Sequence, residues 1–379
     1  MFLYLWLALV FLLGACVGSF LNVCIYRLPW EKNLLWPGSH CGHCFQAIRW
    51  YDNLPLLSYL WLRGRCRFCG GRFSFRYFFI ELFTGLCFAG LFYLITVVNI
   101  HDFPQLRGEG WRLAHGWPPP AAAWLAFFHH AFLVSFLLVA SFCDLDHQEI
   151  PLSITIPGTA VGLLWAVLLP WPAPNEPHAP VDPGTALPWW HAPPRLQGDA
   201  FDPRVQPWAQ APLGQGPRLG YYVWPMWGPP PDWLPPGSWR LGLATGVAGA
   251  AAGWLLLWLV RFLFTKGLGV EAMGLGDADL MMMAGAFLGW QPVVVGFFIS
   301  VFPGLLFGLG QLAWRGSRAL PFGPSLAIGC LAALLGWHWM APRLQLLFFD
   351  GWLLLILGGL GGTMMFAISF LLRLTRRPE

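Results

Sequence analysis

Charged side chains are scarce in this sequence: Lys, Arg, Asp and Glu make up 11% of its 379 residues, whereas 57% are hydrophobic. Soluble domains carry about 25% charged residues, so the composition excludes an ordinary soluble domain and predicts a polytopic membrane protein. The net charge is only +4, and nucleic-acid binding finds no support. The first apolar run, residues 1–25, lacks the basic segment of a cleavable signal and is long enough to span a bilayer.

Further apolar runs predict an all-α membrane protein of eight or nine transmembrane helices. After residues 1–25, they lie near 77–99, 121–143, 150–170, 241–264, 278–290, 292–313, 324–341 and 350–372. The run at 278–290 is short, and its boundary with the next run decides whether the protein has eight or nine transmembrane helices.

Basic residues are concentrated in the polar segment 26–76, which holds eight Arg or Lys against Glu31 and Asp52. The positive-inside rule places this loop in the cytoplasm and the N-terminus outside. With nine helices, the basic C-terminus is also cytoplasmic. The same topology puts Asp144 and Asp277, each at the end of an apolar run, on the cytoplasmic side.

Prolines are concentrated between residues 171 and 239, which hold more than half of the chain's 34. Such a density opposes regular helix and sheet. We expect this stretch to be an extracytoplasmic insertion of extended chain. The chain then divides into the first transmembrane helix (1–25), the cytoplasmic loop (26–76), helices with the first acidic cluster (77–170), the insertion (171–239) and helices with the second acidic cluster (240–379).

Four cysteines form two C-x-x-C pairs, Cys41/Cys44 and Cys66/Cys69, with 21 residues between the pairs. This spacing is typical of a tetrahedral Cys₄ zinc site. Thiols in a reducing cytoplasmic loop are free to bind metal. Four thiolates leave no open position for water, so we expect a structural zinc. A redox dithiol and a chance arrangement are the alternatives.

The acidic clusters Asp144-Leu145-Asp146 and Gly274-Leu275-Gly276-Asp277 each lie at the end of an apolar run. A carboxylate there is costly unless it is used or paired. Gly274 and Gly276 allow another backbone to approach Asp277 closely. Residues two apart on a helix point in different directions, so we expect Asp144 and Asp277, and not Asp146 and Asp279, to face each other. Two such acids would share a proton, as an aspartyl protease requires.

Several separate motifs together resemble the prepilin peptidases, also called type IV leader peptidases/N-methyltransferases, of the GxGD membrane aspartyl protease family. The motifs are residues 18–23 with 26–29, the two C-x-x-C pairs with 50–58 between them, Arg76-Tyr77, Glu81-Leu82, 144–148 with Ile150-Pro151, 274–277 with 285–290, and 321–324. The chain differs from the usual pattern at Gly42, Leu152 and Asp279, and in having the 171–239 insertion. None of these differences removes a catalytic aspartate or a zinc ligand.

The resemblance implies an enzyme of the bacterial inner membrane whose active site faces the cytoplasm. Its substrates would be type IV prepilins or type II secretion pseudopilins with a basic leader, and Asp144 and Asp277 would be the catalytic residues. The cysteine-bearing loop also implies N-methylation of the new N-terminus with S-adenosylmethionine.

Methyl transfer has no independent signature, because no Rossmann-type glycine motif follows a strand. Polar residues of the loop motifs are candidates for this activity or are part of the loop scaffold: Asn22, Arg27, Tyr51, Asp52, Asn53 and Glu81.

Two other classes of function compete with this interpretation. A non-catalytic, zinc-stabilised scaffold of a pilus or secretion machine would have no reason to keep two costly acids on one side of the membrane. An ion-coupled transporter would place its acids near the bilayer midplane and often contains inverted repeats, and the sequence shows no repeat between its halves.

Overall fold

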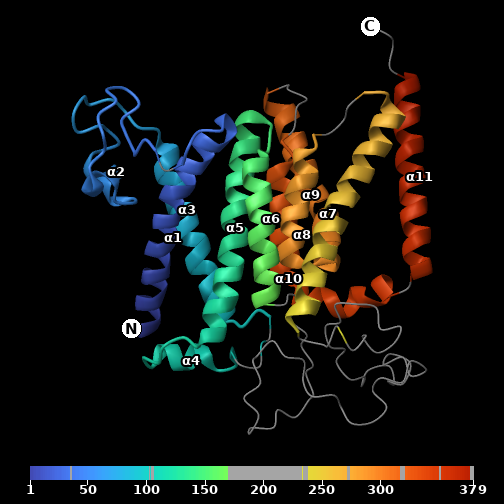
Figure 1. Ribbon diagram of the computed structural model, residues 1–379, viewed down its shortest axis with the longest axis horizontal. Coiled ribbons are helices and arrows are strands. Elements are labelled where there is room, and N and C mark those ends of the chain that lie inside the picture. Colours follow the sequence, from blue (N-terminus) through green and yellow to red (C-terminus); the bar gives the residue numbers. More distant parts are fainter. Residues whose placement is uncertain are drawn as a thin grey trace. The chain divides into compact units, whose positions relative to one another are not determined.

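The computed structural model describes residues 1–34, 36–101, 103, 106–169, 233, 238–270, 274–315, 321–349 and 351–375 (Figure 1). Within these residues every regular element is a helix: α1 (Phe2–Arg27), η1 (Leu28–Trp30), η2 (Trp50–Asn53), α2 (Leu57–Trp61), α3 (Phe75–Thr96), α4 (Glu109–Ala114), α5 (Ala121–His147), α6 (Leu152–Leu168), α7 (Trp239–Leu268), α8 (Gly276–Leu288), α9 (Trp290–Arg315), α10 (Gly323–Phe349) and α11 (Gly351–Thr375). The predicted insertion at 171–239 lies almost wholly outside the described residues.

Among the described helices, seven are long and apolar enough to cross a membrane: α1, α3, α5, α7, α9, α10 and α11. The other two predicted runs are also helical, as α6 with 17 residues and α8 with 13. At about 1.5 Å per residue, α8 is only about 20 Å long, shorter than the hydrocarbon core. The prediction of an all-helical membrane protein is confirmed, and the number of spans depends on the two short helices, α6 and α8.

The chain forms two compact units, Met1–Ile154 and Thr155–Glu379. In the first unit, α1 and α3 pack against each other and against α5. A Cβ added at Gly18 of α1 would lie 2.8 Å from the Glu81 Cα of α3, and one at Gly14 would lie 2.9 Å from the Gly85 Cα. Because only glycine permits such contacts, the two backbones touch, as is common between membrane helices.

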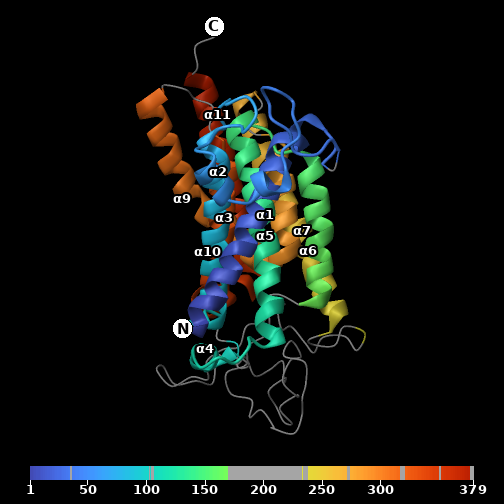
Figure 2. The same ribbon diagram turned by 90° about the vertical axis from the view of Figure 1, so that its left-hand side faces the viewer.

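The two ends of the first unit differ in character. The cysteine-bearing loop between α1 and α3 lies at one end, and α4 lies at the other, with the N-terminus (Figures 1 and 2). Towards the α4 end, His101 Nε2 is 2.9 Å from His130 Nε2, and the Nδ1 atoms of His129 and His130 are 3.2 Å apart. All three imidazoles are buried and satisfy part of one another's hydrogen bonding.

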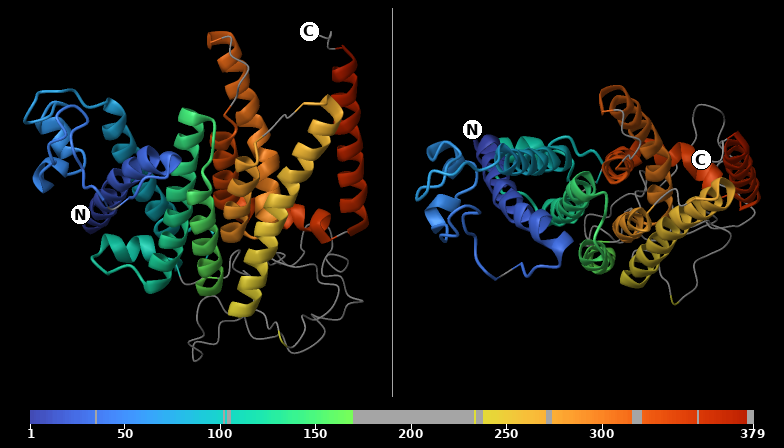
Figure 3. Two further views of the ribbon diagram at one scale, coloured as in Figure 1. Left: turned by 45° about the horizontal axis from the view of Figure 1, so that its top comes forward. Right: turned by 90° about the horizontal axis from the view of Figure 1, so that it is seen from above.

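The second unit is built around close packing of α7 on α8. A Cβ at Gly249 would lie 2.1 Å from the Gly285 carbonyl oxygen, and one at Gly253 would lie 2.2 Å from the Met281 carbonyl oxygen. On another side α11 lies beside α7, where Gly267 faces Ser369 (Figure 3). The α7–α8 contact fixes the short helix that begins at the second acidic motif.

Candidate functional site

The two C-x-x-C pairs adopt the same turn. The Cys41 N–H donates to the Gln46 carbonyl and the Cys66 N–H to the Gly71 carbonyl, at 3.0 and 2.8 Å. In each turn the residue after the second cysteine, Phe45 or Gly70, has a positive φ, of 55° and 69°. Each pair is thus a hairpin-like knuckle that directs two sulfur atoms to the same side.

The four sulfur atoms converge on one point. Cys41 Sγ is 3.8 Å from Cys69 Sγ, Cys44 Sγ is 4.0 Å from Cys66 Sγ, and all four lie within 4.8 Å of one another. Tetrahedral zinc with Zn–S bonds of about 2.3 Å places its sulfur ligands about 3.8 Å apart. Backbone N–H groups of Cys44 and His43 lower the pKa of the Cys41 thiol to about 6, whereas desolvation and the neighbouring thiols raise the pKa of the Cys69 thiol to about 11, so Cys41 is the member of this cluster that most readily forms a thiolate. The geometry and chemistry therefore fit a metal ion of the predicted kind.

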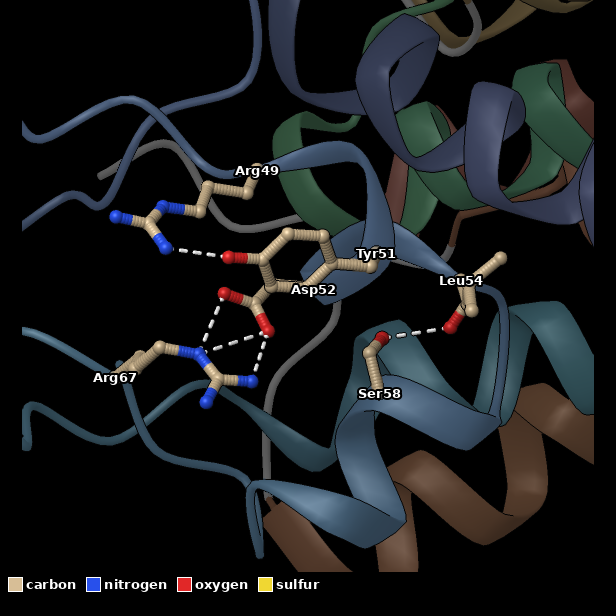
Figure 4. Close-up of polar contacts among 6 residues, drawn as sticks. All are labelled: Arg49, Tyr51, Asp52, Leu54, Ser58 and Arg67. Atoms are coloured by element: carbon tan, nitrogen blue, oxygen red, sulfur yellow. Dashed lines mark hydrogen bonds and ion pairs between the residues drawn. The ribbon is translucent and has the colours of Figure 1, made fainter.

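An ion pair fixes the middle of the loop to the second knuckle (Figure 4). Both carboxylate oxygens of Asp52 accept hydrogen bonds from the Arg67 guanidinium, at 2.5 to 3.0 Å. This interaction lowers the pKa of Asp52. The Tyr51 ring lies 5.8 Å from the guanidinium group of Arg49 and 5.6 Å from that of Arg67, and its hydroxyl oxygen accepts a hydrogen bond from Arg49 (Figure 4). Asp52 is therefore occupied in holding the loop, while Tyr51 and its neighbour Asn53 remain exposed.

Two other candidates, Arg27 and Glu81, hold the loop to the helices, and a third, Asn22, joins α1 to α3. The buried Arg27 guanidinium donates to the carbonyl oxygens of residues 33, 34 and 37, at 2.9, 3.1 and 2.6 Å. Asn22 Nδ2 donates to the Tyr77 carbonyl at 3.1 Å, and Glu81 Oε2 accepts the Leu56 N–H at 2.8 Å. These contacts support the loop-scaffold interpretation of Asn22, Arg27 and Glu81.

Asp144 lies in the last turn of α5, at the same end of the first unit as the cysteine loop, and is 6% exposed. Gln148, with a φ of 55°, ends the helix by donating its N–H to the Asp144 carbonyl at 2.8 Å. Arg76, at the start of α3, contacts one residue that precedes Asp144 in the chain and one that follows it. Its Nη1 donates to Asp146 Oδ1 at 2.6 Å, and its guanidinium lies 5.2 Å from the Phe142 ring.

In the sequence, only the Arg76-Tyr77 motif marks Arg76, and the motif by itself indicates no role. The other end of the loop also contacts α5, since Trp30 makes an edge-to-face contact with His147 at 5.6 Å. Both ends of the cysteine loop thus hold the segment that carries Asp144.

Asp277 lies in the first turn of α8, in the second unit, and is partly exposed. The positive end of a helix dipole favours a carboxylate at this position. Neither Gly274 nor Gly276 has a positive φ, and a Cβ at Gly274 would meet no atom closer than 3.9 Å. Among the described residues of this unit, no other segment lies within 3.9 Å of that position, and the close approach expected beside Asp277 stays a prediction. The pairing of Asp277 with Asp144 stays a prediction.

Comparison with known proteins decides the family. Residues 12–95 match the model described as "Bacterial Peptidase A24 N-terminal domain", and residues 131–180 and 236–309 match "Type IV leader peptidase family". A protein from Aeromonas hydrophila named prepilin leader peptidase/N-methyltransferase is 31% identical over 360 residues, which cover 88% of this chain and 91% of that protein. The chain belongs to the type IV leader peptidase family. No solved structure matches it.

Other members of this family are similarly close. Proteins of the same name from Pseudomonas putida and Myxococcus xanthus are 30% and 31% identical over 369 and 312 residues. These alignments cover 90% and 82% of this chain, and 95% and 64% of those proteins. The first family match contains the cysteine loop, and the two segments of the second contain Asp144 and Asp277.

Proposed function

We propose that this protein is a multi-pass inner-membrane peptidase that removes the leader of type IV prepilins or type II secretion pseudopilins and then N-methylates the new N-terminus. The observation that carries the proposal is the match to proteins named prepilin leader peptidase/N-methyltransferase along 88% of the chain. It favours the enzyme over both a non-catalytic scaffold and a transporter.

Peptide cleavage would use Asp144 and Asp277 as a pair that holds one proton. The ionised member removes a proton from the attacking water, and the protonated member donates a hydrogen bond to the scissile carbonyl. We assign the ionised role to Asp277, because the N-terminal end of α8 stabilises a negative charge. We assign the protonated role to Asp144, which is buried at the C-terminal end of α5.

The cysteine loop would hold zinc through Cys41, Cys44, Cys66 and Cys69, and the ion would supply rigidity because four thiolates leave no open position. S-adenosylmethionine would supply the methyl group for the new N-terminal amine. Asn22, Arg27, Asp52 and Glu81 bind other parts of the protein, and the exposed Tyr51 is hydrogen-bonded to Arg49. Asn53 and the accessible surface of Tyr51 are the exposed candidates for this step. The basic character of the loop supports a cytoplasmic active site.

The test is the N-terminal mass of a co-expressed prepilin. With wild-type protein we expect a leaderless, methylated product, and with Asp277→Asn an uncut prepilin. Asp279→Asn is the matched control, because it removes a carboxylate from the same helical turn. Leader removal by Asp277→Asn would end the two-aspartate mechanism. Cleavage without methylation would leave the peptidase and remove the second activity.

A further inference from the structure

The short helix α2 exposes one apolar face. Leu57, Leu60 and Trp61 are 60%, 62% and 83% exposed. Their spacing of three and four residues places them on the same side of the helix. We call these three residues the α2 patch. Three large apolar side chains that share an exposed face indicate a surface that contacts something other than water.

Contacts made by the opposite face of α2 fix the position of this patch relative to the end of α3. Tyr59 packs on Phe75 and Phe78, with ring centroids 6.1 and 5.4 Å apart. Phe75 begins α3, a helix long and apolar enough to cross the bilayer, and Phe75 and Phe79 are themselves exposed on its surface. The α2 patch therefore lies beside the point where α3 enters the membrane.

Arginines follow the α2 patch directly. Arg63, Arg65 and Arg72 are exposed, whereas the nearby Arg67 is paired with Asp52. Arg65 and Arg72 face each other across an antiparallel bridge, where like charges are destabilising. An anionic partner would relieve this repulsion, and a basic prepilin leader would not.

We propose that the α2 patch and these three arginines dock the cysteine loop on an anionic lipid leaflet. Leu57, Leu60 and Trp61 enter the interfacial region, where Trp is favoured. Arg63, Arg65 and Arg72 bind lipid phosphates. The leaflet thereby holds the loop beside the ends of α1 and α3. This function is independent of the catalytic assignment.

Hydrogen exchange of the full-length protein in nanodiscs tests this docking. The backbone amides of residues 57–63 make only local hydrogen bonds, such as that from the Leu60 N–H to the Leu56 carbonyl at 3.1 Å. A helix of five residues held by such bonds should unfold easily in water, and its amides should then exchange rapidly. One basic residue at an anionic surface favours docking by about fivefold, so three give roughly a hundredfold. We expect exchange to be ten- to a hundredfold slower in discs of phosphatidylcholine mixed with phosphatidylglycerol than in phosphatidylcholine alone.

Two variants separate the contribution of the apolar residues to docking from that of the arginines. The triple change Leu57→Ser, Leu60→Ser and Trp61→Ser should abolish the protection in both kinds of disc. Changing the three arginines to Gln should abolish only the difference between the lipids. Trp50→Ser, at a similarly exposed aromatic residue outside the knuckles, is the matched control and should keep the lipid dependence. Zinc content, measured on every variant, reports whether the loop is folded.

The opposite results would overturn the proposal. Equal exchange in detergent and in both kinds of disc, with zinc bound, would show that lipid does not cover α2. Protection that arises only when a prepilin is added, and that is lost in the triple variant, would assign the patch to protein docking instead.

Discussion

The close contact between α7 and α8 predicts a large loss of cleavage activity for Gly253→Ala. The added Cβ would lie 2.2 Å from the Met281 carbonyl oxygen, where side-chain carbons essentially never come closer than 3.0 Å. The two helices must therefore separate by about 0.8 Å at this point. Met281 lies one turn after Asp277, about 6 Å along α8. The shift is thus passed to the first turn of that helix.

We expect the variant to lose roughly a hundredfold in the kcat of prepilin cleavage, because a displacement of about 1 Å at a reacting group costs about that much. The stability change should be small by comparison. Overpacking costs about 1–3 kcal/mol, and replacing a helical glycine with alanine recovers about 1 kcal/mol. The assay is single-turnover cleavage of a prepilin in reconstituted membranes, with thermal unfolding measured on the same sample.

Gly359→Ala on α11 is the matched control, because a Cβ there meets nothing within 4 Å and should leave cleavage unchanged. If Gly253→Ala cleaves at the wild-type rate with unchanged unfolding, then either the α7–α8 contact is not held in the membrane or Asp277 is not positioned by it. Either result would refute the reasoning.

Three further predictions concern the first unit. Cys66→Ser should lower the zinc content, measured by metal analysis, because a hydroxyl replaces one of four thiolates. Arg76→Gln should lower the kcat of cleavage by about tenfold while KM stays constant, because it breaks the ion pair to Asp146 beside Asp144. That exposed pair itself should contribute only about 0.2–1 kcal/mol to stability. Asn22→Ala should reduce the free energy of unfolding by about 0.5–1.5 kcal/mol, because the Tyr77 carbonyl loses its side-chain donor but stays within α3.

Each of these predictions has a control and a contrary outcome. Cys16→Ser removes a thiol outside the knuckles, and an equal loss of zinc in this variant would contradict the four-cysteine assignment. Arg76→Lys keeps the charge and should restore part of the rate. A rate for Arg76→Gln that falls only in proportion to the folded protein would remove its positioning role. Unchanged unfolding of Asn22→Ala would show that water replaces the donor.

The sequence predicted those features that depend on neighbours along the chain. The helical segments follow from apolar runs, because a backbone in lipid must satisfy its own hydrogen bonds. The knuckles follow from C-x-x-C spacing. The sequence could not show that Asn22 binds the carbonyl of Tyr77, 55 residues away, or that Arg76 reaches Asp146, 70 residues away. Such contacts depend on which helices pack together, and hydropathy does not encode that choice.

The backbone contact between Gly18 and Glu81 has a consequence for metal binding. It brings the two ends of the cysteine loop together without any help from the metal. A free chain of that length would lose about 3 kcal/mol of entropy on closing its ends. In the intact protein, the packing of α1 against α3 already holds these ends together. Zinc binding closes only the 21 residues between the two cysteine pairs, and this closure costs about 0.5 kcal/mol less inside a loop whose ends are already joined. Zinc should therefore bind roughly two- to threefold more tightly to the full chain than to an excised loop peptide. The membrane helices thus favour metal binding, although none of them supplies a ligand.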